Sequence, residues 1–409
     1  MNRNHRNRRI RSVRRSSLAA GVLVLGALLL ACGTKPEPYN VILVTLDTTR
    51  ADYLSCYGAP NAAQTPYFDG IAAEGTLFER AIAQASVTPV SHASILTGLY
   101  QYQHGVRVLY AASGYRLDPA VPRITTVLRD KGWRTGAFLS AFPVSEQFGF
   151  DTGFEVFDNG IQAATDTVMQ QSDDGRVRWN VAKNQRRSDV TTDRVIAWID
   201  EIGKDPFFTW IHYWDPHDMS LKPPREVVSE LVPRGTVGDD YRRKMYAAEV
   251  QYVDSQFGRL VEHLKETGKW DRTIVVVTSD HGEGLGDHDW WNHRILYQEQ
   301  IRVPLLVRIP GEAGGKRVSS IVRTIDAVPT LYDWLGVESE GHMEGRTLLP
   351  LMRGEADEPR IAYADQLNMY DTNANMVARR PNDDLLYCAV DDNWKFIYRP
   401  RRPDLSELY

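Results

Sequence analysis

Apolar runs typical of buried strands alternate along the chain with segments that repeat apolar residues at helical spacing. Strand-like runs are expected at 40–46, 135–140, 207–212 and 274–277, and helical segments at 65–75, 88–97, 125–131, 189–202 and 241–267. This alternation predicts an α/β fold with a mostly parallel central sheet and helices on both faces. After Pro350 the pattern becomes mixed, with a strand-like run Trp394 to Tyr398, which predicts a small C-terminal α+β subdomain.

Side chains able to bind a metal follow two of the predicted strands. Asp47 follows the run at residues 40–46, and Asp280 and His281 come after the run at residues 274–277. Open α/β sheets place their sites at the carboxyl ends of parallel strands. A third segment, Thr88-Pro89-Val90-Ser91-His92, begins a helix between them. We therefore expect oxygen and nitrogen ligands from these segments to converge on one metal ion.

Thr88 is the candidate nucleophile. With Thr88 as N-cap, Pro89 at the first helical position and Gly98 after the last turn, the helix is predicted to begin at the hydroxyl. Its first amides would then face a bound anion. A threonine hydroxyl is a weak nucleophile at neutral pH, and metal coordination is one of the few ways to activate it. The alternative is that Thr88 only caps a helix.

The composition indicates an exported globular enzyme. The 409 residues are 43% hydrophobic and 10% aromatic, which is enough for a large core. The formal charge is −5, but residues 1–31 hold seven arginines and no acidic residue, so the chain without them carries −12. A chain this acidic offers no broad basic face for a nucleic acid, and we expect no nucleic-acid partner.

Residues 1–32 have the pattern of a lipoprotein-type signal peptide. An arginine-rich start precedes an apolar stretch, and Leu29-Leu30-Ala31-Cys32 stands at the cleavage position. We expect a signal peptide ending at Cys32, a lipid anchor on Cys32 and a tether over 33–39. The protein would then be a membrane-anchored lipoprotein of the cell envelope, facing the periplasm or the exterior. An uncleaved anchor is the alternative, although the apolar stretch of about 13 residues is shorter than the roughly 20 of a spanning helix.

Five segments carry a resemblance to a known family. They read LVTLDTTRAD at 43–52, SHASILTG at 91–98, TSDHGE at 278–283, RVPL at 302–305 and GRTL at 345–348. In this order they resemble the sulfatase family of the alkaline phosphatase superfamily. The resemblance implies a catalytic domain over 40–350 and leaves 351–409 as the C-terminal subdomain. Family members continue beyond the final tyrosine, so either this protein lacks their last helix or the chain is incomplete.

The resemblance implies a metal site and a nucleophile at four positions. Asp47, Thr88, Asp280 and His281 fall where the family places metal ligands, and Thr88 also occupies the nucleophile position. We expect one divalent ion held by these residues.

Three histidines match catalytic positions of the family. His92 falls where sulfatases keep an arginine beside the nucleophile, and His217 resembles their substrate-contacting histidine. His293 lies where the family places a lysine or histidine near the leaving group. His217 and His293 are alternatively ordinary surface or core residues, which is the interpretation we favour for His104, His212 and His288.

The chain departs from the family at the nucleophile. Sulfatases need a cysteine or serine that maturation oxidises to formylglycine, and Thr88 cannot give that aldehyde. The usual second aspartate after Asp47 is replaced by Thr48, and the late asparagine of many sulfatases is His281. Losing a carboxylate and gaining an imidazole favours Zn²⁺, with Mn²⁺ and Ca²⁺ as alternatives.

Three functions remain open at this point. The favoured one is a metal-dependent hydrolase or transferase of anionic esters, with phosphoesters preferred and a covalent intermediate on Thr88. The second is a sulfuric ester hydrolase that lacks formylglycine, and the third is a non-catalytic binding lipoprotein. The substrate is expected to be an anionic ester of a small molecule, glycan or lipid. Two polar stretches, 160–188 and 218–240, are candidate lids over the site.

Overall fold

The part of the chain that the structure describes is built around a sheet of nine strands. The computed structural model describes residues 38–60, 62–109, 114–160, 169–171, 177–179, 185–217, 221–339, 341–371 and 374–409. The strands are β1 Asn40–Leu46, β2 Thr76–Ile82, β3 Arg134–Leu139, β4 Val156–Asp158, β7 Phe207–Tyr213, β8 Thr273–Ser279, β9 Arg302–Val303, β10 Leu305–Arg308 and β11 Lys316–Arg323. Their order is β11-β2-β10-β8-β1-β7-β3-β4, with β9 paired to β2. The five strands from β8 to β4 are parallel to one another, which confirms the predicted sheet.

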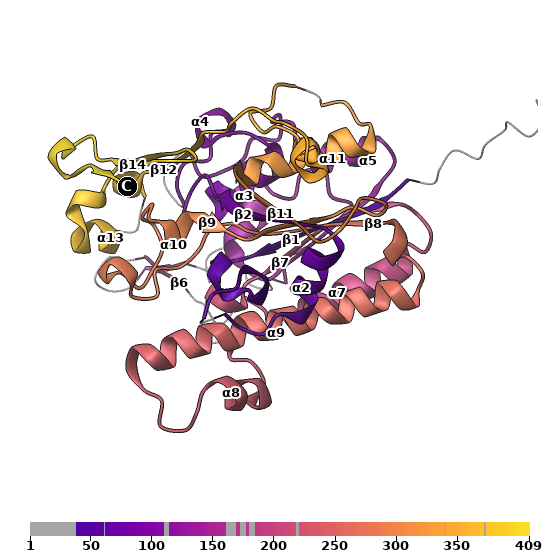
Figure 1. Cartoon of the computed structure of the whole chain (residues 1–409), viewed down its shortest axis with the longest axis horizontal. Coiled ribbons are helices and arrows are strands. Elements are labelled where there is room, and N and C mark those ends of the chain that lie inside the picture. The colour runs from indigo at the N-terminus through magenta and orange to yellow at the C-terminus, as the bar shows by residue number, and fades with distance from the viewer. Residues whose placement is uncertain are drawn as a thin grey trace, which may run out of the picture. The chain divides into compact units, whose positions relative to one another are not determined.

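Both faces of the sheet are covered by helices, as predicted (Figure 1). Helices α2 (Pro66–Glu74), α7 (Ser188–Glu201) and α9 (Gly238–Glu266) cover one face, and α3 (Thr88–Thr97), α5 (Ile124–Asp130) and α11 (Ala327–Leu335) cover the other. Alternate residues of β1 pack on opposite faces of the sheet. Ile42 and Val44 belong to the core with α2, α7 and α9, and Val41 and Leu43 belong to the core with α3, α5 and α11. Because β1 is buried on both faces, it reads in sequence as one continuous apolar run.

A small antiparallel sheet forms the C-terminal part of the chain, which confirms the predicted subdomain. Its strands are β12 Ala362–Gln366, β13 Leu386–Val390, β14 Lys395–Tyr398 and β15 Glu407–Leu408, and helix α13 (Ala374–Arg379) lies beside it. The predicted strand-like run from Trp394 is β14, which begins one residue later, at Lys395. The remaining short helices are α4 Gln101–His104, α8 Arg225–Leu231, α10 Gln298–Ile301 and α12 Leu349–Arg353.

Two of the predictions concern segments that are only partly described. In the stretch 160–188 the strands β5 (Met169–Gln171) and β6 (Val177–Trp179) pair with each other, and most of the rest lies outside the described residues. In the stretch 218–240, helix α8 packs against α9 on the side away from the sheet (Figure 1). The predicted signal peptide, Cys32 and most of the tether lie outside the described residues as well. Among the helices that are described, none has the length and apolar character needed to cross a membrane.

Candidate active site and metal centre

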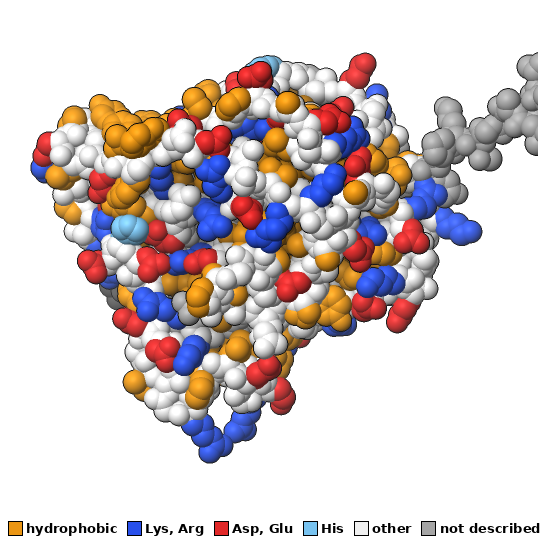
Figure 2. Space-filling view, in the orientation of Figure 1, with side chains coloured by type: hydrophobic (Ala, Val, Ile, Leu, Met, Phe, Trp, Pro, Cys, Tyr) orange, Lys and Arg blue, Asp and Glu red, His pale blue; other side chains and the backbone are white. Residues whose placement is uncertain are grey.

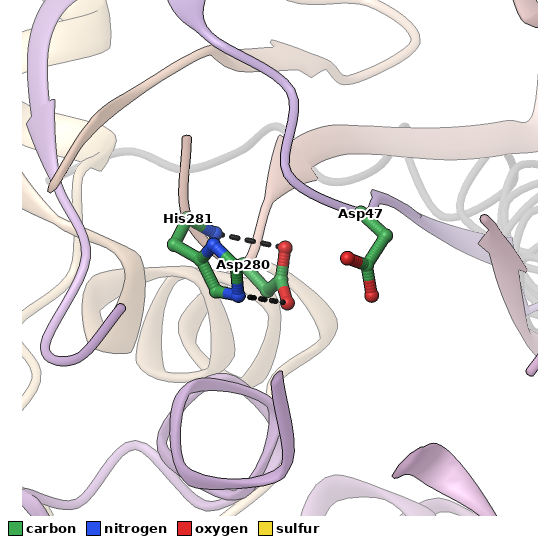
Figure 3. Close-up of side chains that lie close together, drawn as sticks. All are labelled: Asp47, Asp280 and His281. Atoms are coloured by element: carbon green, nitrogen blue, oxygen red, sulfur yellow. Dashed lines mark hydrogen bonds and ion pairs between the residues drawn. The ribbon is translucent and has the colours of Figure 1, made fainter. Parts of the chain in front are cut away.

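Asp47 and Asp280 lie side by side because β1 and β8 are adjacent parallel strands. Leu46 pairs with Ser279 in their register, so each strand is followed by an aspartate at the same edge of the sheet. One ligand atom each from Asp47, Asp280 and His281 lies within 4.8 Å of the other two. Figure 3 shows Asp47 across from the Asp280 and His281 pair. The structure therefore brings together the three ligands expected from the two strand ends.

The atoms that meet at this point are hydrogen-bond acceptors. The Nδ1–H of His281 donates to the carbonyl of Gly282 over 2.9 Å, which leaves a lone pair on Nε2 of the neutral ring. That nitrogen lies 3.3 Å from Oδ2 of Asp280. Oδ2 of Asp280 and Oδ1 of Asp47 are buried without a hydrogen-bond partner among the described residues. Facing lone pairs repel each other unless a cation lies between them, so this donor set fits a metal ion.

Burial shifts the ionisation of these groups strongly. Burial, followed by repulsion from Asp280, raises the pKa of Asp47 well above its usual range. Burial also raises the pKa of Asp280 to about 8 and holds the pKa of His281 well below its usual value. Among the described residues, only histidines lie within ion-pair distance of the two carboxylates. Two ionised carboxylates here need a positive partner, which a divalent ion would supply.

A strained turn after Asp47 orients Asp280. Thr48 has a φ of 50°, in the left-handed region that a β-branched residue rarely adopts. Its N–H donates to Oδ1 of Asp280 over 3.1 Å, and the N–H of His281 donates to the same oxygen over 2.8 Å. The hydroxyl of Tyr246, on α9, donates to the carbonyl of Thr48 over 2.6 Å. Backbone amides thus satisfy one oxygen of Asp280 and leave the other available for a ligand.

Thr88 opens helix α3 beside this cluster. Its Oγ1 lies 3.5 Å from Nε2 of His281, and its side chain is almost fully buried. The predicted N-cap role of Thr88 is wrong, because the carbonyl of Val87 accepts the first helical hydrogen bond, from Ser91. Val87 is therefore the N-cap and Thr88 the first helical residue. The hydroxyl is consequently not occupied by capping the helix and lies beside His281 and Asp47.

His92 is sealed inside the protein. It has no solvent exposure, its Nδ1–H donates to the carbonyl of Thr88 over 2.8 Å, and its Nε2 accepts from the hydroxyl of Thr45 over 3.0 Å. Burial lowers the pKa of His92 to about 3, so the ring is neutral. His92 therefore lies beside Thr88, and its two nitrogens link the first turn of α3 to strand β1.

His217 and His293 both reach the site. The ring of His293 lies 4.6 Å from that of His281 and 5.3 Å from that of His217, measured between centroids. His217 ends the short turn Asp215–His217 after β7 and stacks on Trp214 at 3.7 Å. Burial lowers the pKa of His293 to about 3. His217, predicted to contact substrate, and His293, predicted to lie near the leaving group, are thus neighbours, and His293 lies against His281.

Two residues of the site were not found by sequence reasoning. His212 was interpreted as an ordinary histidine, yet its Nε2 lies 2.9 Å from Oδ2 of Asp47. Its Nδ1 accepts from the N–H of Ser140 at 3.4 Å, so Nε2 carries the proton and donates to Asp47. The carboxylate of Glu283 lies 3.2 Å from Nδ1 of His293. Only their positions in the sequence could have indicated these two residues. His212 lies near the end of the strand beside β1, and Glu283 follows the DHG segment.

Comparison with known proteins agrees with this geometry. A family model described as Sulfatase matches residues 39–337, and one described as N-sulphoglucosamine sulphohydrolase, C-terminal, matches residues 286–409. The N-acetylglucosamine-6-O-sulfatase of Bacteroides thetaiotaomicron is 24% identical over 85% of this chain and 78% of its own length. A multifunctional alkaline phosphatase superfamily protein of Trinickia caryophylli is 26% identical over 90% of this chain and 88% of its own.

Solved structures share the fold. An enzyme solved in complex with its substrate D-glucosamine-2-N,6-O-disulfate has a TM-score of 0.73 and 22% identity, with 91% of both chains covered. The phosphonate monoester hydrolase of Agrobacterium radiobacter has a TM-score of 0.67 and 22% identity, covering 91% of this chain and 89% of its own. The chain is therefore a hydrolase of the sulfatase family, in the alkaline phosphatase superfamily.

Proposed function

We propose that this sulfatase-family hydrolase cleaves an anionic ester by a covalent route through Thr88, with phosphoesters preferred over sulfate esters. The observation that carries the proposal is the position of the Thr88 hydroxyl, 3.5 Å from Nε2 of His281, at the edge of a cluster made of acceptor atoms. A threonine hydroxyl beside a metal site is the arrangement that a metal-activated nucleophile needs.

Asp47, Thr88, Asp280 and His281 would hold one divalent ion. Enzymes of this family use a divalent metal, and the two carboxylates and imidazole form a suitable group here. An imidazole and few carboxylates suit Zn²⁺ best, with Mn²⁺ and Ca²⁺ as alternatives. When bound, the ion would lower the pKa of the Thr88 hydroxyl and neutralise charge on the ester oxygens.

Residues of the chain itself carry out attack, proton transfer and charge stabilisation. Oγ1 of Thr88, after giving its proton to solvent, attacks the phosphorus or sulfur in line, while His293 or His217 gives a proton to the departing oxygen. The first amides of α3 face the ester oxygens that gain charge. His92 holds the carbonyl of Thr88 and so keeps the nucleophile at the head of the helix. Water, or an acceptor hydroxyl in a transferase, then releases the product from Thr88.

Sulfate ester hydrolysis without formylglycine is the second candidate. It is supported by the family itself and by relatives that are named sulfatases. The phosphoester preference is supported by the threonine, by His281 in place of asparagine, and by the fold shared with a phosphonate monoester hydrolase. A non-catalytic binding role has the least support, because the metal-ligand group is intact.

We assign the enzyme to the cell envelope, as a lipoprotein anchored through Cys32. The support is the sequence of residues 1–32, with its arginines, apolar stretch and LLAC segment. The catalytic domain would then act on esters outside the cytoplasm.

Thr88 variants test the nucleophile. Each variant is loaded with Zn²⁺, Mn²⁺ or Ca²⁺ and assayed on aryl phosphate monoesters, aryl phosphate diesters and aryl sulfates. Thr88→Ala is expected to lose activity by orders of magnitude and Thr88→Ser to retain part of it. Thr97→Ala is the matched control, because Thr97 is a buried threonine of the same helix whose hydroxyl donates to Ala93. Full turnover by metal-loaded Thr88→Ala would refute the nucleophile, and faster cleavage of sulfates than phosphates would select the second candidate.

A further inference from the structure

Glu283 lies in the site without belonging to the metal-ligand group. It follows His281 by two residues, and its side chain is 11% exposed. One carboxylate oxygen, Oε1, accepts from the N–H of Gly284 over 3.1 Å, and the other, Oε2, lies 3.2 Å from Nδ1 of His293. The carboxylate is therefore fixed at one end by the backbone and points its other end at an imidazole.

The loop that carries Glu283 is held rigidly. Arg50 donates to the carbonyls of Glu283 and Gly284, at 3.4 and 3.5 Å, and to the carboxylate of Asp287 at 2.7 Å. The guanidinium of Arg50 also pairs with Asp52 at 2.7 Å. This arginine ties the loop after β8 to the loop after β1, so Glu283 is held in register with the metal ligands.

His293 lies in a loop that is held through its backbone rather than through its ring. The indole of Trp290 donates to the carbonyl of His293 over 2.8 Å, and the next residue, Arg294, has a φ of 83°. The neighbouring rings of His281 and His217 lie tilted against the imidazole, with centroids 4.6 and 5.3 Å away. Among the described residues, the carboxyl group of Glu283 is the hydrogen-bond partner that occupies Nδ1 of this ring.

We propose that Glu283 is the positioning residue of His293, holding Nδ1 so that Nε2 is the nitrogen that gives a proton to the departing oxygen. This inference rests on the proposed function, in which His293 gives a proton to the departing oxygen, and it identifies Glu283 as the group that orients the ring. It holds whichever of the two groups carries the shared proton, because Nδ1 is occupied in both cases. In both cases Nε2 carries a proton of its own. As the bond from phosphorus or sulfur to the ester oxygen breaks, its electron pair goes to that oxygen, which takes the proton from Nε2, and the shared proton ends on Nδ1, so the ring is left as a neutral imidazole.

The chain offers a matched control for this pair. His288 lies on the same loop, and its Nδ1 is 3.0 Å from Oε1 of Glu299, whose side chain is 6% exposed. The two pairs have the same chemistry and similar burial of the carboxylate, but the ring of His288 stacks on Tyr297, outside the group of metal ligands. Changing Glu299 therefore reproduces the loss of a glutamate–histidine contact on the same loop, at a histidine that is 43% rather than 16% exposed.

The experiment measures kcat and KM of the metal-loaded enzyme on aryl esters whose leaving groups range from nitrophenol to phenol. The variants are Glu283→Gln, Glu283→Met, His293→Ala, Glu299→Gln and Glu299→Met, each checked for metal content and melting temperature. An acid helps a poor leaving group most, so Glu283→Met is expected to lose about 100-fold in kcat on the phenyl ester and far less on the nitrophenyl ester. Glu283→Gln, which still bonds Nδ1, is expected to recover most of that loss, and both Glu299 variants should match the unmodified enzyme.

The outcomes separate this inference from the proposed function. If His293→Ala shows the steep leaving-group dependence but Glu283→Met loses activity equally on every ester, Glu283 does not position the acid and the inference is overturned. A Glu283→Gln variant as impaired as Glu283→Met overturns it too, because orientation alone would then be insufficient. If His293→Ala itself shows no leaving-group dependence, the acid role of His293 fails along with Glu283, while the Thr88 variants still decide the nucleophile.

Discussion

His212 donates a hydrogen bond from Nε2 to Oδ2 of Asp47 over 2.9 Å, and both side chains are fully buried. The bond comes from β7, the neighbour of β1, so three adjacent strands contribute to one centre. A bond of this kind would orient the carboxylate of Asp47 and leave its Oδ1 available to a metal ion.

Replacing His212 should therefore weaken metal binding although it is not one of the three grouped ligands. We expect His212→Ala to lower metal affinity or kcat by about 10- to 100-fold, measured by metal titration and by aryl ester turnover. The control is His104→Ala, because His104 is an equally buried histidine that bonds Ser94 and Val106 away from the site. Equal effects of the two changes would mean that only a buried histidine was lost.

Removing the metal should abolish activity and lower stability together. The acceptor atoms of Asp47, Asp280 and His281 repel one another without a cation, so the loaded protein should melt at a higher temperature. At a metal concentration 100 times the Kd, binding adds about 2.7 kcal/mol to the free energy of unfolding. Chelation followed by re-addition of each metal, with calorimetry and turnover measured in parallel, checks this. A melting temperature that no metal changes would contradict it.

Asp280→Asn should separate metal binding from folding. The change removes a carboxylate whose pKa burial raises to about 8, so the metal-free variant should be at least as stable as the metal-free parent. Its bound metal and its turnover should nevertheless fall by orders of magnitude. Metal analysis and melting curves of both proteins, with and without chelator, measure the two effects. A variant that binds stoichiometric metal would remove Asp280 from the ligand set.

Asp254 should make stability depend on pH in a defined direction. Burial raises its pKa to about 7, although the amides of Tyr67 and Phe68 donate to it. Between pH 4 and 7 the folded protein holds a proton on this carboxyl that the unfolded chain has lost, so its contribution to stability falls as pH rises, by about 1.4 kcal/mol per pH unit, and levels off above pH 7. Melting curves of metal-loaded Asp254→Asn should lack this part of the slope. An unchanged slope would assign the pH dependence to other groups.

Cys32→Ala should release the protein from membranes. The predicted lipid anchor depends on this thiol, so the variant should lose incorporation of labelled fatty acid and leave the membrane fraction. Cys56→Ala is the control, because Cys56 is a free cysteine of the folded domain. Membrane retention of Cys32→Ala with an uncleaved N-terminus would favour the alternative of a signal anchor.

Regular elements were predictable because their signal is local. The run from Asn40 to Leu46 is buried on both faces of a parallel strand and therefore contains no polar interruption. Helix α3 matches its predicted range, since Pro89 near its start and Gly98 after its end mark both ends within the sequence. The polar residues directly after these elements were correctly placed near one another, because parallel strands end at a common edge.

The sequence by itself determined the class of fold, the family, and the grouping of Asp47, Asp280 and His281. Apolar periodicity and the residues that follow strand ends are local features of the chain and can be recognised without the fold. Only the tertiary structure decided that Val87 rather than Thr88 caps α3, that both nitrogens of His92 are hydrogen-bonded, and that His212 contacts Asp47 and Glu283 contacts His293. His212 and Asp47 are 165 residues apart in the chain. The direction of a side chain across such a separation depends on strand register and on strained turns such as that at Thr48, which leave no local pattern in the sequence.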